Sequence, residues 1–508
     1  MNPQTQSPQA TLELTSSQRN FLWGALAILL VIRVLLMIQV PYTDTTEARY
    51  AEIARKMVET NDWITPQIDY GVPFWGKPPL HTWVSAAGMK LFGVNEFGGR
   101  FFIFVTGILI LRWFYRWAQE FKGKDYALLG TTILGSSALY FVAMATVMTD
   151  LVMIAGTTLS MIAFWRALHG NQKTVSAGYL FFVGLAIGLL AKGPVAFVLT
   201  AIPIGAWVLI HNRWRETWRR LPWISGTLLM LALSLPWYLL AELKTPGFLQ
   251  YFIVGEHFER FIHSGWKGDL YGSGHAKPRG TIWIYWLEML LPWTFLFLIP
   301  LRRLRSVVNG FRRDTSRWSS YLLCWALSPM IFFTMATNVI PTYVITGIPA
   351  SCLLLVDMWV HAASGQREAT LATARSFKAS AVASILIFAG AYLTFTFVPA
   401  IAPKRTQKTL VGQKIRAEGF ISAPLYYFSK KNFSIEFYTE GKAIRLDHPD
   451  ALKKLLADKK RDFVSIDADK FKALDPALQN AYFQHGKFGK SLLLSEKPTS
   501  GTTSISER

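Results

Sequence analysis

Two acidic side chains and a basic one follow an apolar run of about twenty residues, the length that crosses a bilayer. They are Asp44, Glu47 and Arg49, in the stretch PYTDTTEARYAEIARKM at residues 41–57. One interpretation is a capping box, in which Asp44 caps the first amides of a helix and Glu47 reaches back to its start. The other is catalytic: a carboxylate takes a proton from an acceptor, and Arg49 holds an anion. The two interpretations are compatible.

Further ionisable and aromatic residues recur near the ends of other apolar runs. They are Lys77, Asp150, Lys192, Glu256, His257, Arg260 and Tyr343. Taken singly, each has an ordinary explanation: a lysine snorkels to the membrane edge, a tyrosine anchors at the interface, and an acid and a base pair along a helix. Taken together, they supply carboxylates for acid–base chemistry and cations that bind an anion such as phosphate.

The membrane context narrows the substrate to a lipid-linked donor with an anionic head. A carboxylate would activate or orient the acceptor, while cations stabilise the charge that develops on the departing lipid phosphate. The sequence contains no Walker loop, zinc-type histidine cluster or nucleophile elbow, which argues against a pump driven by ATP, a metalloprotease and a serine hydrolase. No cofactor is required by this chemistry. If a divalent metal binds, Asp44 and Asp150, with Glu47, are the candidate ligands.

A polytopic membrane protein is expected to position these residues. Of the 508 residues, 51% are apolar and only 17% are charged, whereas soluble proteins have about a quarter charged residues. Eleven runs are candidate spanning helices, at 21–40, 98–118, 126–148, 151–168, 177–191, 194–210, 223–241, 281–300, 320–336, 340–360 and 379–399. The predicted fold is therefore mainly α-helical.

Charge indicates the orientation of these spans. The formal net charge is +21, and basic residues cluster in five loops that share one side if the N-terminus is cytoplasmic. The positive-inside rule accounts for this pattern better than nucleic-acid binding does. Eleven spans then place residues 401–508 outside, in the periplasm of a Gram-negative cell.

The first outer loop, residues 41–97, contains two predicted amphipathic helices. The apolar face of the first recurs at helical spacing, at Tyr50, Ile53, Ala54, Met57 and Val58. The second covers residues 78–92. We expect both helices to lie along the membrane surface and to form a wall over a cavity.

The two ends of the chain differ from the apolar bundle. Residues 1–20 are polar and rich in Pro, Gln and Ser, which is typical of a disordered cytosolic tail. Strand-like pieces at 434–438 and 462–466 and a helical piece at 449–459 predict a small soluble α/β domain. The predicted domains are the tail 1–20, a transmembrane domain 21–400 and the soluble domain 401–508.

A set of short motifs occurs in a fixed order between about residue 40 and residue 350. It comprises Thr46-Glu47-Ala48-Arg49-Tyr50-Ala51-Glu52-Ile53, Asp62-Trp63-Ile64-Thr65-Pro66, Lys77-Pro78-Pro79, Thr149-Asp150, Ala191-Lys192-Gly193, Leu235-Pro236-Trp237, Glu256-His257-Phe258-Glu259-Arg260-Phe261, Leu291-Pro292-Trp293 and Pro341-Thr342-Tyr343. The ordered set resembles the GT-C membrane glycosyltransferases of the protein-O-mannosyltransferase superfamily, in particular their lipid A aminoarabinose transferase (ArnT) branch.

The resemblance implies a GT-C fold and an enzyme of the bacterial inner membrane. Such an enzyme moves a sugar from a polyprenyl-phosphate carrier, often undecaprenyl phosphate, to lipid A, another glycan or a protein on the periplasmic face, usually with inversion. An acidic residue of the first outer loop is the expected catalytic carboxylate, and later lysines with His257 or Arg260 would hold phosphates. The alternative from another class is a transporter or flippase for lipid-linked sugars, which needs polar residues in both halves of the bilayer.

Two positions depart from the pattern of the ArnT branch. Thr46 stands where an aspartate is expected, so we favour Asp44 as the catalytic acid, with Glu47 as the alternative and Asp150 as a third carboxylate on the same side. Gly76 stands where the branch carries a glutamate. This change removes a carboxylate that would help to bind a metal or an amino sugar, and it argues against aminoarabinose as the transferred sugar.

Overall fold

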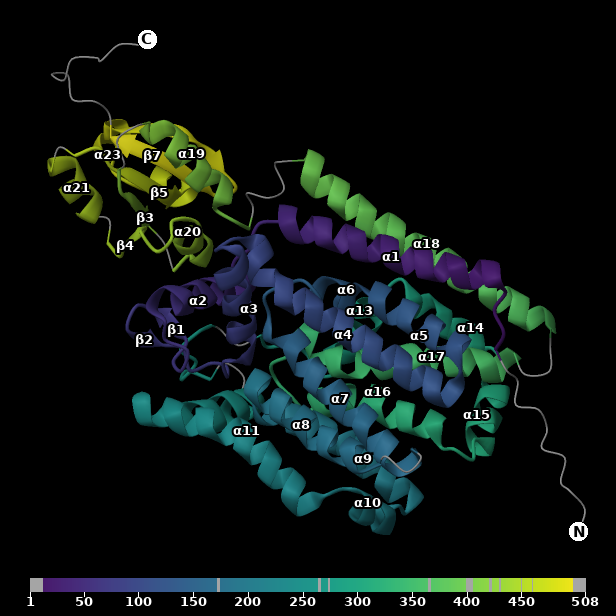
Figure 1. Ribbon diagram of the computed structural model, residues 1–508. Coiled ribbons are helices and arrows are strands. Elements are labelled where there is room, and N and C mark those ends of the chain that lie inside the picture. The colour runs from purple at the N-terminus through teal and green to yellow at the C-terminus, as the bar shows by residue number, and fades with distance from the viewer. Residues whose placement is uncertain are drawn as a thin grey trace, which may run out of the picture.

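The structure is a computed structural model of the chain. It describes residues 12–170, 174–263, 266–272, 275–363, 367–398, 405–419, 423–428, 431–448, 450–458 and 460–496. The predicted tail lies outside the described residues as far as residue 11, and so does the predicted domain boundary at residues 400 and 401. Most of the described chain is helical, and its strands form one two-stranded and one five-stranded sheet (Figure 1).

Eight helices of the described chain are long and apolar enough to cross a membrane. They are α1 (Ser16–Gln39), α4 (Glu96–Lys122), α7 (Thr149–His169), α8 (Thr174–Lys192), α9 (Pro194–His211), α11 (Trp223–Lys244), the continuous pair η3 (Pro341–Gly347) and α17 (Ile348–Ala363), and α18 (Arg367–Phe397). The chain is thus a multi-pass membrane protein with a mainly α-helical fold, as the sequence predicts. α1 begins at Ser16 rather than at residue 21, because Thr15 and Gln18 form a capping box there.

The other three predicted spans are helical but broken or short. Residues 126–148 form α5 (Lys124–Ser136) and α6 (Ala138–Ala143), which are separated by the extended Ser137. Residues 281–300 form α13 (Thr281–Met289), η2 (Trp293–Phe297) and α14 (Leu298–Leu301), with a bend of 102° at the break. Pro292 lies in that break, where it has no amide to continue a helix. Residues 320–336 form α16 (Trp318–Thr334), which has 17 residues.

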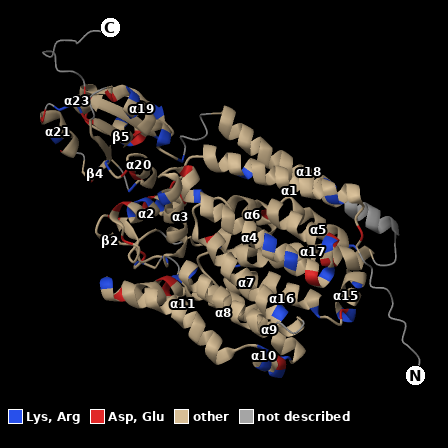
Figure 2. Cartoon of the chain, in the orientation of Figure 1, with Lys and Arg blue, Asp and Glu red and all other residues tan. Residues whose placement is uncertain are grey.

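Two short helices rich in arginine lie at one end of the bundle. They are α10 (Trp214–Arg220) and α15 (Leu304–Arg313). Figure 2 shows their basic residues at the end away from α2 (Thr46–Thr60) and α3 (Leu80–Phe92), with few charges along the helices between. The positions of these basic clusters agree with the predicted charge pattern.

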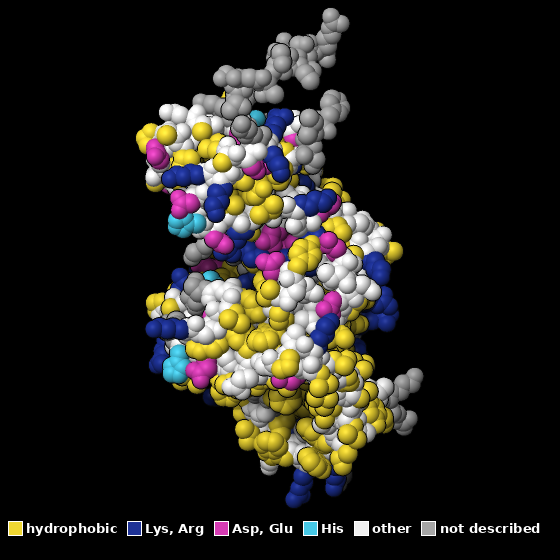
Figure 3. Space-filling model, turned by 90° about the vertical axis from the view of Figure 1, so that its left-hand side faces the viewer, with side chains coloured by type: hydrophobic (Ala, Val, Ile, Leu, Met, Phe, Trp, Pro, Cys, Tyr) yellow, Lys and Arg dark blue, Asp and Glu magenta, His cyan; other side chains and the backbone are white. Residues whose placement is uncertain are grey.

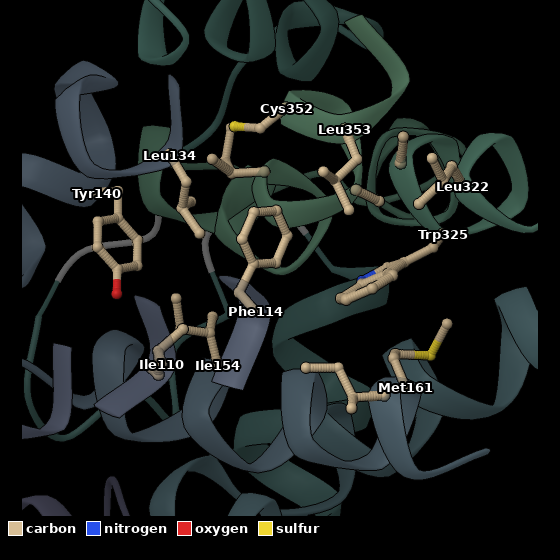
Figure 4. Packing of buried hydrophobic residues seen from close by; sticks show 14 of the residues in the cluster. Ile110, Phe114, Leu134, Tyr140, Ile154, Met161, Leu322, Trp325, Cys352 and Leu353 are labelled. Atoms are coloured by element: carbon tan, nitrogen blue, oxygen red, sulfur yellow. The ribbon is translucent and has the colours of Figure 1, made fainter. Parts of the chain in front are cut away.

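The core of the bundle is packed where α4, α7, α16 and α17 meet. Phe114 of α4, Met161 of α7 and Trp325 of α16 are all buried, and they point toward one another (Figure 4). Trp325 also donates a hydrogen bond from its indole nitrogen to the carbonyl of Thr346, at 2.7 Å, so this polar group is satisfied inside the core.

Glycines allow α7 and α8 to pack backbone against backbone. A Cβ atom at Gly156 would lie 2.5 Å from the carbonyl oxygen of Gly184 and 2.6 Å from the amide nitrogen of Gly188. Atoms cannot approach so closely without a shift of the helices. Small residues are the usual means of close helix contact in a membrane, where lipid is as apolar as leucine.

The first outer loop forms a compact layer of α2, β1 (Gln67–Asp69), β2 (Val72–Pro73) and α3. The predicted apolar face of α2 is confirmed, since Tyr50, Ile53, Ala54 and Met57 are buried. The opposite face of α2 is also covered, because α20 (Phe433–Tyr438) packs on it. α2 thus lies between α3 on one side and α20 on the other, and its position along the membrane surface stays a prediction.

The C-terminal region is the predicted small α/β unit. Its elements are α19 (Lys408–Glu418), β3 (Leu425–Phe428), α20, β4 (Ile444–Leu446), α21 (Asp450–Ala457), β5 (Phe463–Asp467), α22 (Ala468–Lys472), α23 (Pro476–Ala481), β6 (Tyr482–Phe488) and β7 (Ser491–Glu496). The sheet order is β4-β3-β5-β7-β6, in which β4, β3 and β5 are parallel and β7 and β6 are antiparallel. The predicted strand at 462–466 and helix at 449–459 are confirmed as β5 and α21.

The predicted strand at 434–438 is wrong, because these residues form α20. Asn432 caps this short helix by accepting a hydrogen bond from the amide of Ile435, at 3.0 Å. Glu436 then points to α2, where its carboxylate lies 3.2 Å from Nζ of Lys56. The polar and apolar residues alternate here because this short helix is buried in two separate contacts. They do not mark the two faces of a strand.

The C-terminal region packs onto the first outer loop through several polar contacts (Figure 1). Lys431 pairs with Asp69 at 2.7 Å, and Lys408 pairs with Glu96 at 2.5 Å. Tyr438 donates a hydrogen bond to the same Glu96, at 2.8 Å. The first loop and the described part of the C-terminal region are therefore in direct contact.

Candidate active site

The predicted capping box at the start of α2 does not form. α2 begins after Thr45, and this residue makes no capping hydrogen bond to the described residues. Asp44 instead faces the C-terminal region, where its carboxylate accepts hydrogen bonds from the amide of Ser434, at 3.1 Å, and from the Ser434 hydroxyl. Burial raises the pKa of Asp44, and the hydrogen bonds from Ser434 act against this rise.

Glu47 is bound by a guanidinium on both of its carboxylate oxygens. Nε and NH2 of Arg100 in α4 each donate a hydrogen bond to it at 2.8 Å, and the amide of Val147 donates another at 3.2 Å. Arg100 also donates to the carbonyls of Met37 and Val40 at the end of α1. Glu47 thus joins the start of α2 to α4 through a buried, bidentate ion pair, and Arg100 connects this pair to the end of α1.

Arg49 lies in an aromatic setting and pairs with no predicted site residue in the described chain. Its guanidinium donates to the carbonyl of Tyr271 at 2.8 Å and lies 5.2 Å from the ring centre of Tyr50 and 5.9 Å from that of Phe74. Cation–π contacts of this kind hold an arginine while leaving other donors available for an anion.

Lys192 lies at the break between α8 and α9. Gly193 has a φ of 86°, a backbone conformation that favours glycine, and Pro194 begins α9 directly after it. Nζ of Lys192 lies 2.7 Å from the carboxylate of Asp150, in the first turn of α7. It also lies 5.2 Å from the ring centre of Tyr343. The structure thus brings three of the predicted site residues into direct contact.

A second group forms around Glu256 of η1 (Gln250–Glu259). Its carboxylate lies 2.9 Å from Nζ of Lys77 and 3.1 Å from the guanidinium of Arg260, which begins α12 (Arg260–Ile262). Arg260 also lies 3.7 Å from Asp269. Burial acts to raise the pKa of Glu256, but Lys77 and Arg260 outweigh it, and the pKa falls to about 2. The carboxylate therefore stays ionised and holds both cations.

His257 connects the two groups. Its Nδ1 lies 2.7 Å from the carbonyl oxygen of Phe252, and its ring packs on the Phe252 ring. A Cβ at Gly193 would lie 3.2 Å from Cε1 of His257, so the imidazole sits against the break that presents Lys192. Burial lowers the pKa of His257, and Lys77 lowers it further. The imidazole is thus neutral at pH 7.

His81 is a buried residue at the site that sequence reasoning missed. Burial lowers its pKa to about 3, and the charges that act on it include Lys77, Asp150 and Arg49. Its ring packs edge to face on Tyr50, with centres 4.8 Å apart. Its position four residues after Lys77, near the start of the predicted helix at 78–92, was the signal that could have found it.

The predicted site residues divide into two sets. Seven of them lie in the two contact groups or between them, namely Asp150, Lys192, Tyr343, Lys77, Glu256, Arg260 and His257. Asp44, Glu47 and Arg49 have other partners, in α20, in α4 and in the loop at Tyr271. Within the described residues, Asp44, Glu47 and Asp150 do not form a three-carboxylate metal group.

Gly76 occupies a space bounded by aromatic rings. A Cβ there would lie 2.8 Å from the Phe74 ring and 3.1 Å from the Tyr271 ring. Tyr271 is fixed in this place, because its hydroxyl donates to the carbonyl of Pro73 and accepts from the amide of Trp75. Aromatic side chains therefore fill the position next to Lys77 that would receive a carboxylate in the ArnT branch.

Charged side chains of both signs gather in the middle of the face shown in Figure 3, below the C-terminal region. Hydrophobic side chains cover the lower part of this face. Exposed leucines of α11 such as Leu228, Leu239 and Leu243 have the character expected of a surface in contact with lipid. The charged layer is thus bounded by an apolar zone, as an active site at a bilayer edge would be.

Comparison with known proteins shows which families and structures the chain resembles. The sequence model of the dolichyl-phosphate-mannose-protein mannosyltransferase family matches residues 21–252. The undecaprenyl phosphate-alpha-4-amino-4-deoxy-L-arabinose arabinosyl transferase of Edwardsiella ictaluri is 28% identical over 334 residues, covering 64% of this chain and 56% of the relative. The protein of the same name from Aeromonas salmonicida is 30% identical over 347 residues, covering 66% and 59%. The chain thus spans less than two thirds of the length of these relatives.

A solved structure shares the whole fold. The crystal structure of ArnT from Cupriavidus metallidurans bound to undecaprenyl phosphate has a TM-score of 0.76, with 19% sequence identity, and covers 96% of this chain and 99% of that one. The apo structure of the same protein gives a TM-score of 0.71. The likeness extends over both the helical bundle and the C-terminal region. The chain is therefore similar in sequence to the dolichyl-phosphate-mannose-protein mannosyltransferase family over residues 21–252, and it shares the fold of the ArnT crystal structures.

Proposed function

We propose that this protein is an integral-membrane glycosyltransferase that moves a sugar from a polyprenyl-phosphate-linked donor to lipid A, another cell-envelope glycan or a protein. The relatives carry a name that specifies an undecaprenyl phosphate-linked donor. The C. metallidurans structure of the same fold holds undecaprenyl phosphate. The donor class proposed for this chain is therefore an undecaprenyl-phosphate sugar.

The observation that carries the proposal is the convergence of basic groups near the Gly193 break. Lys192 is held by Asp150 at 2.7 Å, and Lys77 is held by Glu256 at 2.9 Å. His257 lies between the two lysines, against Gly193. Because the carboxylates already hold the lysine side chains in place, less side-chain entropy is lost when a phosphate binds. A doubly anionic phosphate also competes well with the carboxylates for these cations.

We assign the three predicted carboxylates different roles. Asp44 is the proposed base, because it is held by a neutral serine and its raised pKa makes it more basic than an ordinary aspartate. Glu47 is bound by Arg100 on both oxygens and positions the start of α2. Asp150 positions Lys192.

In the proposed reaction, an oxygen of the acceptor forms a bond to C1 of the sugar while the bond from C1 to the lipid phosphate oxygen breaks. The electron pair of that bond leaves with the phosphate, whose charge Lys77, Lys192 and Arg260 stabilise. Where the acceptor is a hydroxyl, its proton passes to Asp44. An acceptor that is already anionic needs no proton transfer. Attack from the face opposite the leaving group inverts the configuration at C1.

We place this site on the periplasmic side of a bacterial inner membrane, with the N-terminus in the cytoplasm. The arginine clusters of α10 and α15 at the opposite end of the bundle support this orientation. We also retain the division into a tail 1–20, a transmembrane domain 21–400 and a soluble periplasmic domain 401–508 as a proposal.

The test is transfer by the purified full-length protein from synthetic polyprenyl-phosphate sugars to lipid A, followed by mass spectrometry. Lys192→Ala should reduce transfer by about 100-fold or more, because the leaving phosphate loses a cation. Lys244→Ala is the matched control, since Lys244 is half-exposed and pairs with Asp62 away from the two groups. Flipping of the donor in liposomes without transfer would show a transporter instead.

The donor panel should include neutral sugars beside 4-amino-4-deoxy-L-arabinose. The relatives' name points to the amino sugar, whereas Gly76 supplies no carboxylate for an amino group, and the carboxylate of Glu256 near Lys77 is held by Lys77 and Arg260. Transfer of a neutral sugar in preference to the amino sugar would assign the specificity to this position.

A further inference from the structure

Three carboxylates meet at one end of the C-terminal sheet, away from the candidate active site. They belong to Asp458, Asp462 and Glu496, and one oxygen from each lies within 4.8 Å of the others. Among the described residues, no other group of three or more acidic, histidine or cysteine side chains is so close.

The strand register brings these residues together. β5 and β7 are antiparallel, and Phe463 is paired with Ser495. Asp462 precedes Phe463 and Glu496 follows Ser495, so the two acids face each other at the next position. They share the sheet face of Val464 and Leu494. This face packs on α21 through Leu452 and Leu455, and Asp458 follows directly at the end of that helix.

Asp462 is buried without a polar partner among the described residues. Its side chain is 1% exposed, and neither carboxylate oxygen has a hydrogen-bond partner. Oε1 of Glu496 is also buried and unpartnered. An ionised carboxylate costs several kcal/mol to bury without compensation, so the group as described is incomplete.

Among the described cations nearby, Lys460 acts to lower the pKa of Asp462, but burial and Asp458 outweigh it. Arg461 donates to the carbonyls of Ala417 and Glu418, on the α19 side. Lys460 contacts Asp458 through its backbone amide, at 2.8 Å. Burial, together with Asp458, raises the pKa of Asp462 to about 6, and burial and Asp462 raise that of Glu496 to about 7. Burial is the larger cause of both shifts, and repulsion between the carboxylates adds to it.

We propose that Asp458, Asp462 and Glu496 form a binding site for a divalent cation of the calcium type. All ligands in the group are hard carboxylate oxygens, which suit Ca²⁺, Mg²⁺ or Mn²⁺ rather than Zn²⁺ or Cu²⁺. Calcium–oxygen distances of about 2.3–2.6 Å place two ligands of one ion up to about 5 Å apart, which matches the spacing of the three oxygens. The exposed side of Asp458 leaves room for water to complete the coordination.

The site would join three elements of the region. Asp458 follows α21, Asp462 leads into β5 and Glu496 ends β7. An ion bound by all three would hold the ends of the two central strands together and fix α21 over them. Its role is therefore structural, in a region whose α20 packs on α2, and it is independent of the proposed transferase activity.

The test uses the full-length protein in detergent, stripped with EDTA and titrated with CaCl₂ by calorimetry. The candidate variant is Asp462→Asn, which keeps the size of the side chain and removes its charge. The control is Asp447→Asn, because Asp447 is an exposed aspartate of the same region that pairs only with Arg445 in the described chain. Wild type and Asp447→Asn should each bind one more Ca²⁺ than Asp462→Asn, or bind it at least about tenfold more tightly.

Hydrogen–deuterium exchange locates the effect on the same samples. Ca²⁺ should slow amide exchange in residues 463–467 and 491–496 of wild type and leave the rates of Asp462→Asn unchanged. Glu496→Gln should likewise lose the effect of Ca²⁺ on amide exchange. If Asp462→Asn does not fold, Glu496→Gln takes its place in the test. Equal Ca²⁺ binding by wild type and both variants, or no change in exchange at β5 and β7, would overturn the proposal and indicate that the carboxylates share a proton instead.

Discussion

At the scale of single residues, Glu47 serves as a structural anchor. Its two oxygens accept from Arg100 at 2.8 Å inside the protein. Removing one partner of a buried pair leaves the other charge without compensation, which costs roughly 3–5 kcal/mol. Glu47→Ala should therefore lower the free energy of unfolding by that amount, measured by denaturant unfolding in detergent.

The control for Glu47→Ala is Glu440→Ala. Glu440 is exposed and pairs with the exposed Lys442 at 3.2 Å, and such surface pairs contribute less than about 1 kcal/mol. If the two variants lose the same stability, the ion pair with Arg100 does not anchor α2.

His81 predicts a dependence of stability on pH. Its pKa is about 3 in the folded protein, against 6.5 for an ordinary histidine, so the unfolded chain takes up a proton that the folded chain does not. The contribution of neutral His81 is therefore complete above pH 6.5 and is lost as the pH falls toward about 3. The loss is at most about 1.4 kcal/mol per pH unit.

The free energy of unfolding is measured as a function of pH for wild type and for His81→Gln. The quantity of interest is the difference between these two profiles. Groups that titrate in both proteins cancel in the difference. The two profiles should converge as the pH falls from about 6.5 to about 4, because only wild type loses the contribution of a neutral imidazole. Parallel profiles would mean that His81 titrates normally.

A test of catalysis at the same scale is Asp44→Asn. Loss of the proposed base should lower the rate of transfer to a hydroxyl acceptor by about 100-fold or more, while the hydrogen bonds from Ser434 keep an oxygen acceptor. The readout is transfer beside the unfolding midpoint. A fall in stability with the rate unchanged would assign Asp44 to docking of the C-terminal region alone.

At the scale of elements, the contact between α7 and α8 depends on the absence of side chains. Gly156→Ala would place a Cβ 2.5 Å from the Gly184 carbonyl oxygen, so the helices must separate, at a cost of about 1–3 kcal/mol. Gly205→Ala in α9 is the control, because nothing lies within 4 Å of its Cβ position. Thermal unfolding should show a loss of stability for Gly156→Ala and no loss of stability for Gly205→Ala.

The sequence predicts elements well where one periodic signal dominates. The long apolar runs and the Asp462–Ile466 strand were found because burial acts on the whole segment. Residues 434–438 were misassigned because five residues fit either the helical or the strand period, and only the Asn432 cap and the Lys56–Glu436 pair decide for a helix.

The candidate site was likewise predictable only where its contacts are local in the sequence. Local spacing revealed Glu256 with Arg260, but the partners of Asp44 and Glu47 lie 390 and 53 residues away.

At the scale of the whole molecule, the contact between α20 and α2 should control the order of the first outer loop. Glu436 lies 3.2 Å from Lys56 and 3.6 Å from Lys431. Glu436→Gln removes its charge, and amide exchange in residues 46–60 should rise by about tenfold for each 1.4 kcal/mol lost. Glu440→Gln, just after the same helix, is the control and should leave these rates unchanged. Unchanged exchange in both variants would mean that α2 is held by α3 alone.

The hydrogen bonds between Asp44 and the C-terminal region also have a consequence for synthesis. The backbone amide of Asp44 donates to the carbonyl of Arg405, at 2.7 Å, and its carboxylate accepts from Ser434. The ribosome makes Ser434 390 residues after Asp44. The outer loop therefore stays unfinished while the helices between them enter the membrane, and it is completed only after the C-terminal region has been made. A chain that terminates before residue 405 would therefore lack both of these hydrogen-bond partners of Asp44.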